Sequence, residues 1–288
     1  TTGTEADPFK TIDHAMSRSY STANDPITIN LTEGTFSPST TGEVFPIRMI
    51  SNVNLIGQGE EATILDAEQT DRVIKIDACE NNIISHLTIT GGEGGIYLNN
   101  SDPILSYVTI SGNTTSGSGG GIVTAPSLTD NSHSHLTLIH VTISGNTAGS
   151  NGGGMYLQWS DATLTNVTIS ENTAINHSGG GTWLYNSNST FTNVTISGNT
   201  ANANADEASG VMKLIGSNVI FTNSIIWGNS PESIYFNNPN LADPNTVTIH
   251  YSDIQGGEEG INTNDNGEVY WLEGNINTDP LFSNPENG

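Results

Sequence analysis

Six side chains of the sequence carry a fixed positive charge, and they are the groups best suited to chemistry on an acidic substrate. Arg72 and Lys75 form the only close pair, and Lys213 stands alone in the second half of the chain. A cation can neutralise the carboxylate of an acidic sugar, and a lysine can accept the proton beside it. We therefore regard Arg72, Lys75 and Lys213 as candidate catalytic residues.

Three aromatic residues occupy equivalent places after glycine runs. Tyr97 follows Gly94-Gly-Ile96, Tyr156 follows Gly152-Gly-Gly-Met155, and Trp183 follows Gly179-Gly-Gly-Thr182. If these runs are strands of one parallel sheet, the three rings share its outer face with Lys75 and Lys213. Rings spaced at about 4.8 Å per strand could stack on the sugar rings of a glycan, or they could stabilise the sheet by cross-strand packing alone.

Two groups of residues have the spacing of metal ligands. Asn262, Asn264, Asn266 and Glu273 match positions 1, 3, 5 and 12 of a calcium-binding loop, although asparagine is also an ordinary turn residue. His133, His135 and His140 cluster around one loop and could bind a metal ion or serve as exposed stacking partners. Calcium is therefore a possible cofactor.

The charge and the missing motifs exclude several classes of function. The net charge is −24, and six basic residues cannot neutralise many phosphates, so nucleic acid is not an expected partner. The sequence has no run of 18 apolar residues, so no transmembrane helix is expected. Nucleotide-binding loops and the usual hydrolase motifs are missing from the sequence. The single cysteine, Cys79, cannot form an internal disulfide and is expected to be a buried, inert thiol.

Internal repeats organise the whole sequence. Val108-Thr-Ile-Ser-Gly-Asn113 returns with start-to-start spacings of 21 to 33 residues, and a glycine run and a third apolar-polar run accompany it in each period. Alternating β-branched residues indicate strands, and the glycines between them disfavour helices. We therefore predict an all-β fold, a parallel β-helix with three strands per coil and about ten coils, in which loops absorb the variable spacing.

Asparagines recur at two places in each period, where the predicted strands meet at corners. One row directly precedes the Val-Thr-Ile runs and contains Asn166, Asn193 and Asn223, with His86, Tyr107 and His140 in the same place in earlier coils. Asparagine tolerates the left-handed backbone region that a sharp corner requires. A second row predicts a ladder of stacked amides along the axis; its members are Asn113, Asn146, Asn172, Asn199 and Asn229.

The start of the chain differs from the repeats. Asp7 followed by Pro8 is typical of a helix N-terminus, and Phe9, Ile12 and Met16 share one helical face. We predict a helix over residues 7–19 that caps the open end of the solenoid, followed by coils over 25–285. The chain is thus expected to be a single domain, residues 1–288, and a piece of a longer secreted protein.

Several segments resemble a known superfamily. Thr28-Ile-Asn-Leu-Thr-Glu-Gly-Thr-Phe36, Asn52-Val-Asn-Leu-Ile-Gly57 and Gly274-Asn-Ile-Asn-Thr-Asp-Pro-Leu-Phe282 are similar to segments of bacterial right-handed parallel β-helix proteins of the pectin-lyase-like superfamily, of the secreted or surface-anchored type. The resemblance implies the right-handed parallel β-helix fold and a location outside the cell. It also implies that any chemistry lies on the outer face of the first sheet. The superfamily contains polysaccharide lyases, hydrolases, adhesins and tailspikes.

Two functional hypotheses follow. The first is a non-catalytic extracellular β-solenoid that serves as a surface, adhesive or filament-like assembly domain, with a glycan or a second copy of itself as partner. Glycan would bind at Tyr97, Tyr156 and Trp183. The alternative is a polysaccharide-degrading enzyme, a polyuronate lyase or glycoside hydrolase. The few cations and the missing paired acids favour the first hypothesis.

Overall fold

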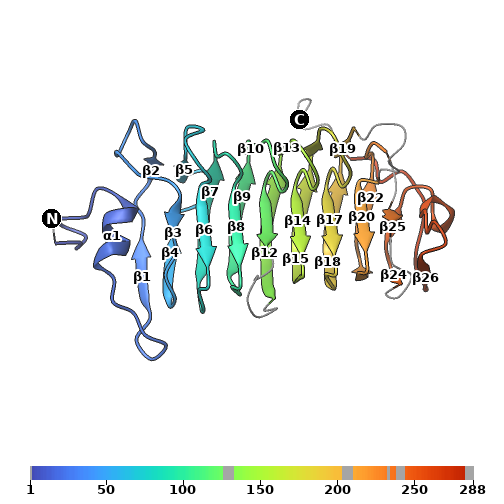
Figure 1. Cartoon of the computed structure of the whole chain (residues 1–288), viewed down its shortest axis with the longest axis horizontal. Coiled ribbons are helices and arrows are strands. Elements are labelled where there is room, and N and C mark those ends of the chain that lie inside the picture. Colours follow the sequence, from blue (N-terminus) through green and yellow to red (C-terminus); the bar gives the residue numbers. More distant parts are fainter. Residues whose placement is uncertain (1, 126–132, 203–209, 232–233, 238–243, 283–288) are drawn as a thin grey trace.

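The structure is a computed structural model that describes residues 2–125, 133–202, 210–231, 234–237 and 244–282. Figure 1 shows a solenoid in which strands from successive coils lie side by side along the long axis, from the N-terminal helix to β26. All pairs of named strands are parallel. The prediction of an all-β parallel β-helix with about ten coils and one N-terminal helix is confirmed.

The first sheet consists of short strands, one per coil, that follow the glycine runs. Within the described residues it is eight-stranded, and its order along the axis is the order of the sequence. Its members are β3 (Ile47–Arg48), β6 (Ile74–Asp77), β8 (Ile96–Asn99), β11 (Ile122–Ala125), β14 (Met155–Gln158), β17 (Thr182–Tyr185), β20 (Met212–Ile215) and β23 (Ile234–Phe236).

The second and third predicted runs of most coils join into one strand with a sharp bend. At the bend the backbone is left-handed, with φ of 57° at His86, 53° at His140 and 56° at Asn166, which confirms the predicted corners. This larger sheet contains β1 (Ile27–Asn30), β2 (Gly34–Phe36), β4 (Val53–Ile56), β5 (Thr63–Asp66), β7 (Ile83–Thr90), β9 (Ile104–Ser111), β12 (Ser134–Ser144), β15 (Ser160–Ser170), β18 (Ser189–Ser197), β21 (Asn218–Thr222), β22 (Ile225–Trp227), β24 (Asn245–His250), β25 (Asp253–Ile254) and β26 (Gly267–Trp271).

A narrow third sheet links the two larger ones. Its two-residue strands are β10 (Thr114–Thr115), β13 (Thr147–Ala148), β16 (Thr173–Ala174) and β19 (Thr200–Ala201). The asparagine that precedes each of these strands is fully buried, and its amide nitrogen donates to the amide oxygen of the next coil's asparagine at 2.9–3.0 Å. The predicted ladder of Asn113, Asn146, Asn172, Asn199 and Asn229 is therefore present, and it supplies the hydrogen bonds that buried backbone groups need.

The N-terminal helix is shorter than predicted. α1 (Ile12–Arg18) begins five residues after Asp7, with Thr11 as its N-cap, and its Ile12 and Met16 are buried in the core. The buried carboxylate of Glu43 accepts hydrogen bonds from the backbone N–H groups of Ile12 at 2.6 Å and Asp13 at 3.0 Å. This distant carboxylate satisfies the donors at the start of the helix, so the Asp7-Pro8 pair does not. Near the other end, a short 3₁₀ helix, η1 (Glu258–Gly260), precedes β26.

Candidate functional site

One row of outward side chains runs along the first sheet, as the sequence predicted. In each strand the flanking residues point into the core, for example Met155 and Leu157 on either side of Tyr156. We call this set the outer row, and the strand register aligns its members as Arg48, Lys75, Tyr97, Val123, Tyr156, Trp183, Lys213 and Tyr235. The register places Lys213 beside Trp183, on the face where the sequence predicted it.

The middle of the outer row is an aromatic cluster of Tyr156, Trp159, Trp183 and Tyr185. The rings of Tyr156 and Trp183 stack with centroids 4.3 Å apart and planes inclined by 3°. The ring of Tyr185 also stacks with that of Trp183, with centroids 5.8 Å apart. Trp159 meets Tyr185 edge-on at 5.9 Å. Trp159 and Trp183, two of the four tryptophans of the chain, thus both contact Tyr185.

Burial differs within the aromatic cluster. Trp159 is 38% exposed and Tyr156 is partly exposed, whereas Trp183 is only 8% exposed. The sequence predicted that Trp183 belongs to an exposed ladder of rings. That prediction is wrong for this residue, because Trp183 is buried beneath the other rings of the cluster. Its indole Nε1 is buried and has no hydrogen-bond partner among the described residues. Burial also raises the pKa of the Tyr156 hydroxyl, and the neighbouring Tyr185 adds to the shift.

Sequence reasoning missed two members of the aromatic cluster. Tyr185 lies two residues after Trp183 in β17, so strand alternation alone would have placed both rings on one face. Trp159 follows β14 in the left-handed backbone region, with φ of 50°, and nothing in its local sequence predicts that conformation. Tyr97, which the sequence grouped with Tyr156 and Trp183, is separated from them by Val123.

A second feature, the cationic recess, lies at the N-terminal end of the outer row. It is a surface hollow of about 220 Å³ lined by Pro46, Arg48, Asp71, Arg72, Lys75 and Tyr97. The structure therefore brings the predicted pair Arg72 and Lys75 together and adds Arg48, which the sequence did not single out. Arg48 could have been found by aligning Ile47-Arg48 with Ile74-Lys75 one coil later.

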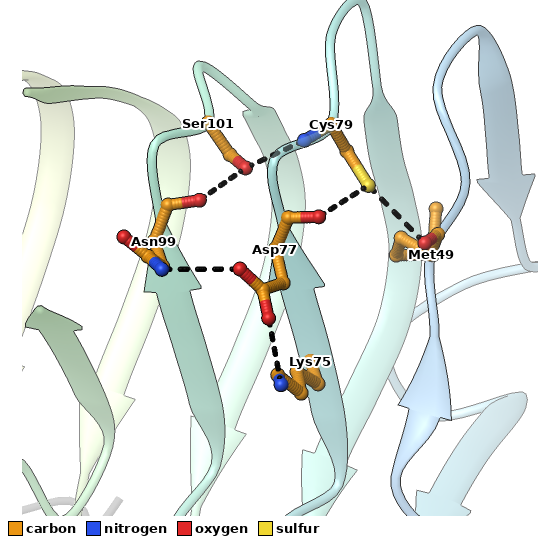
Figure 2. Close-up of polar contacts among 6 residues, drawn as sticks. All are labelled: Met49, Lys75, Asp77, Cys79, Asn99 and Ser101. Carbon is orange, nitrogen blue, oxygen red and sulfur yellow. Dashed lines mark hydrogen bonds and ion pairs between the residues drawn. The ribbon is translucent and has the colours of Figure 1, made fainter. Parts of the chain in front are cut away.

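Lys75 is held in place by its neighbours on the sheet. Figure 2 shows its Nζ atom beside the Asp77 carboxylate, at 2.7 Å, and the amide of Asn99 on the other Asp77 oxygen at 3.1 Å. The Nζ atom also lies 5.5 Å from the ring centroid of Tyr97. The Lys75 and Asp77 side chains are 32% and 42% exposed, so water screens this pair and it adds little stability.

Lys213 does not join the recess. Five strand spacings, about 24 Å, separate it from Lys75 along the outer row. It is 8% exposed, its Nζ donates to Ser178 Oγ at 3.2 Å, and it lies 6.0 Å from the ring centroid of Tyr235. The three candidate catalytic residues thus form one pair and one separate lysine.

The predicted calcium ligands are not brought together. Asn262, Asn264 and Asn266 lie in the turn before β26, and the Asn262 side chain accepts the backbone N–H of Asn264. Glu273 lies beyond β26, whose five residues span about 16 Å, and it accepts the hydroxyl of Tyr251 at 2.6 Å. No group of three or more histidine, cysteine, aspartate or glutamate side chains within the described ranges is placed to hold a metal ion.

The histidines that the sequence considered as metal ligands have separate partners. Tyr107 stacks with His140 at 4.8 Å and with His86 at 5.0 Å. His133 lies against Trp159 at 5.9 Å, and His135 contacts Thr163 Oγ1 at 3.5 Å. The stacking alternative therefore describes His140, whereas the His133 ring is tilted by 54° against Trp159.

Cys79 is buried, as predicted, and its thiol donates to the backbone oxygens of Met49 at 3.2 Å and Asp77 at 3.4 Å (Figure 2). The backbone N–H of Cys79 donates to Ser101 Oγ at 3.0 Å, and Ser101 in turn donates to the Asn99 oxygen. Desolvation by burial raises the pKa of the thiol. The side chain is thus part of the corner that links three coils.

Comparison with known proteins places this solenoid in a family. The model of the NosD family, described as periplasmic copper-binding protein, matches residues 48–257. The chain belongs to the NosD family. No curated protein sequence matches the chain. Among solved structures, the A-module of the mannuronan C-5 epimerase AlgE4 from Azotobacter vinelandii is similar, with 13% identity, 93% of this chain and 94% of that chain covered, and a TM-score of 0.43.

The NosD family description places its members in the periplasm, outside the cytoplasm. In the part of the chain that the structure describes, no helix has the length and apolar character of a membrane span.

Proposed function

We propose that this NosD-family chain is a non-catalytic, secreted or surface-attached β-solenoid that binds a glycan on the outer face of its first sheet. The observation that carries the proposal is the aromatic cluster, in which the partly exposed Tyr156 and the 38% exposed Trp159 are supported by the buried Trp183 and by Tyr185. Sugar rings present apolar faces to aromatic rings, and tyrosine and tryptophan add polar edges for hydroxyl groups.

The rigidity of the support favours binding over a purely structural role. Tyr156 and Trp183 are neighbours in register on β14 and β17, whose inward residues Met155 and Leu184 are fully buried. Rings that are fixed before binding lose little conformational freedom when a ligand arrives. Trp159, which is 38% exposed, extends the cluster towards solvent and offers the ligand an accessible edge.

Copper, the metal named in the family description, does not fit the donor groups discussed above, all of which lie in the part of the chain that the structure describes. Copper binds the soft sulfur ligands of cysteine and methionine and also the imidazole groups of histidine. All four methionines are buried in the core, Cys79 is a buried thiol bonded to backbone, and the histidines discussed above lie in separate places. The proposed function therefore does not include a metal.

The experiment for the proposal is retention on immobilised polysaccharides. We expect the wild-type protein to be retained, and the Tyr156→Ala and Trp159→Ala variants to lose at least tenfold in affinity, because each removes a ring that the ligand would contact. Tyr20→Ala is the matched control, since Tyr20 is 88% exposed and lies outside the first sheet. If neither the wild type nor any variant binds a glycan, the proposal fails.

A polysaccharide-degrading enzyme remains the second candidate, because the recess brings Arg72, Lys75 and Tyr97 together. In a polyuronate lyase the arginine would neutralise the carboxylate, and the lysine would take the adjacent proton while the glycosidic oxygen leaves. Incubation with pectate and alginate tests this. Unsaturated, ultraviolet-absorbing products that disappear in Lys75→Ala, but persist in Lys10→Ala, would favour the enzyme over the binding domain.

Self-association is a third candidate, favoured by the C-terminal edge of the larger sheet. Among the described strands, β26 pairs only with β24, and its Val269 and Trp271 are only partly buried. A free parallel edge can template the first coil of a second copy. Sedimentation at rising protein concentration would show association, and Val269→Lys should reverse it, whereas a monomer throughout would exclude this candidate.

A further inference from the structure

The cationic recess concentrates the rarest charge of the protein. The chain has 30 acidic residues and only six basic ones, yet Arg48, Arg72 and Lys75 all line one hollow of about 220 Å³. Asp71 is the one carboxylate in that lining. One of its oxygens accepts the backbone N–H of Arg72 at 2.7 Å. The lining therefore carries an excess of positive charge on a strongly negative molecule.

The two arginines of the recess have no carboxylate partner in the part of the chain that the structure describes. Within the described residues, neither Arg48 nor Arg72 lies within ion-pair distance of an acidic side chain, whereas Lys75 is paired with Asp77. With 30 acidic residues in the chain, pairing partners are abundant, so two unpaired guanidinium groups in one hollow call for an external anion.

Arg72 is also partly withdrawn from water. Its Nη1 atom is buried without a hydrogen-bond partner, and burial lowers the pKa of the guanidinium despite the raising effects of Asp71 and Glu93 nearby. The group packs on the backbone at Gly94, where an added Cβ atom would lie 2.4 Å from Nη1. A buried, unsatisfied donor is costly, and an oxyanion in the recess would meet the same guanidinium group where Arg72 lines the hollow.

We propose that the cationic recess binds an oxyanion, a carboxylate or sulfate group, of the same glycan that stacks on the aromatic cluster. The proposal rests on the proposed function and gives its ligand class, an acidic glycan. Arg48 and Arg72 supply planar donors for the oxyanion, and Lys75 adds a point charge. Tyr97 lies two strand spacings, about 10 Å, from Tyr156, so a short oligosaccharide along the solenoid axis reaches both.

The test measures equilibrium binding of three oligosaccharide probes of equal length, at low and high salt. They are an oligogalacturonate, which carries carboxylates, a heparin fragment, which also carries sulfates, and a neutral cello-oligosaccharide. We expect the acidic probes to bind more tightly than the neutral one and to weaken with salt. The ratio between the two acidic probes identifies the preferred oxyanion.

Substitutions in the recess separate the two proposals. Arg48→Gln and Lys75→Gln should each lower affinity for the acidic probes about tenfold and leave the neutral probe unchanged. Arg18→Gln is the control, because it removes the same charge from an exposed residue of α1. Arg48 is exposed, so its variant is decisive even if Arg72→Gln fails to fold.

Each outcome bears on one proposal or both. If the recess variants bind the acidic probes as the wild type does while Tyr156→Ala loses all three probes, the oxyanion site is wrong and glycan binding stands. If Tyr156→Ala binds normally while Arg48→Gln does not, the aromatic cluster is not the glycan site, and the joint ligand falls with it. Equal weakening by Arg18→Gln would reduce the recess to a general charge effect, which overturns the oxyanion site.

Discussion

At the scale of single residues, the asparagine ladder shows how a polar side chain stabilises a core. Asn172 is fully buried, and its amide nitrogen donates to Asn199 Oδ1 and to the Ile143 oxygen, both at 2.9 Å. Its oxygen accepts from the backbone and the side chain of Asn146, both at 3.0 Å. One side chain therefore bonds polar groups in the coils before and after its own, and the buried backbone N–H of Asn146 is one of the groups that it satisfies.

Replacing Asn172 by alanine should lower the free energy of unfolding by about 3 kcal/mol, because several buried donors and acceptors lose their partner at once. Chemical denaturation followed by circular dichroism measures the loss. Asn176→Ala is the control, since Asn176 is exposed and its amide nitrogen donates to the backbone oxygen of Gly149. Equal stability of the two variants would show that the ladder contributes no more than a surface amide.

The Cys79 thiol should be unreactive in the folded protein, because it is buried and bonded to two backbone oxygens. Its folded pKa is raised above its unfolded value, about 8.5, so its contribution to stability is complete below that pH and is lost as pH rises through the folded pKa. We expect a thiol reagent to label the protein at pH 8 only after denaturant is added. Immediate labelling of the native protein would contradict the buried position, and Cys79→Ala provides the blank.

At the scale of elements, the glycine runs before the first sheet allow coils to approach one another. A Cβ atom on Gly153 would lie 2.4 Å from the Gly180 oxygen and 2.6 Å from the Thr173 backbone carbon. In the same place the backbone N–H groups of Gly153 and Gly154 donate to the oxygens of Gly179 and Gly180 in the next coil, at 3.0 and 3.1 Å. The runs that begin each strand of the first sheet thus hold the stacking distance that places the outer row in register.

Gly153→Ala should destabilise the protein by more than 3 kcal/mol, because backbone atoms of two neighbouring coils would have to move apart. Gly145→Ala is the matched control. Gly145 has a positive φ of 61° but nothing within 4 Å of its Cβ position, so it should lose only about 1–2 kcal/mol of backbone energy. Thermal unfolding of both variants compares the two costs, and a smaller loss at Gly153 than at Gly145 would refute the close-packing explanation.

At the scale of the whole molecule, net charge opposes the compact state. The chain has a net charge of −24, and the described part contains only one ion pair, between Lys75 and Asp77. Stability must therefore come from the continuous apolar core and the stacked hydrogen bonds of the coils. Three of the six basic residues line the recess and are therefore not spread over the acidic loops.

Salt should raise the thermal midpoint by a few degrees between 20 and 500 mM sodium chloride, because ions screen the repulsion among carboxylates. Calcium and magnesium chloride at matched ionic strength should act equally, since Glu273 is held by Tyr251 and lies across β26 from Asn262. A larger shift with calcium that Asn264→Ala removes would restore the calcium site that the sequence suggested. A midpoint independent of salt would contradict the charge argument.

The sequence by itself determined the coil and its register. Period-two alternation fixes which residues of a strand face the core, and a one-residue error would bury Tyr156 and expose Met155. The repeated glycines and corner asparagines mark the same place in each coil. These local signals sufficed to align Lys75, Tyr97, Tyr156, Trp183 and Lys213 on one face.

Only the tertiary structure decided how that face is divided and covered. The contact between Trp159 and Tyr185, the burial of Trp183, and the meeting of Arg48 with Arg72 each join residues from different coils. The cap at Ile12 likewise depends on Glu43, 31 residues later. A repeat pattern specifies where a side chain leaves the backbone. It does not specify which side chains converge there, because that depends on corner conformations and loops outside the repeat.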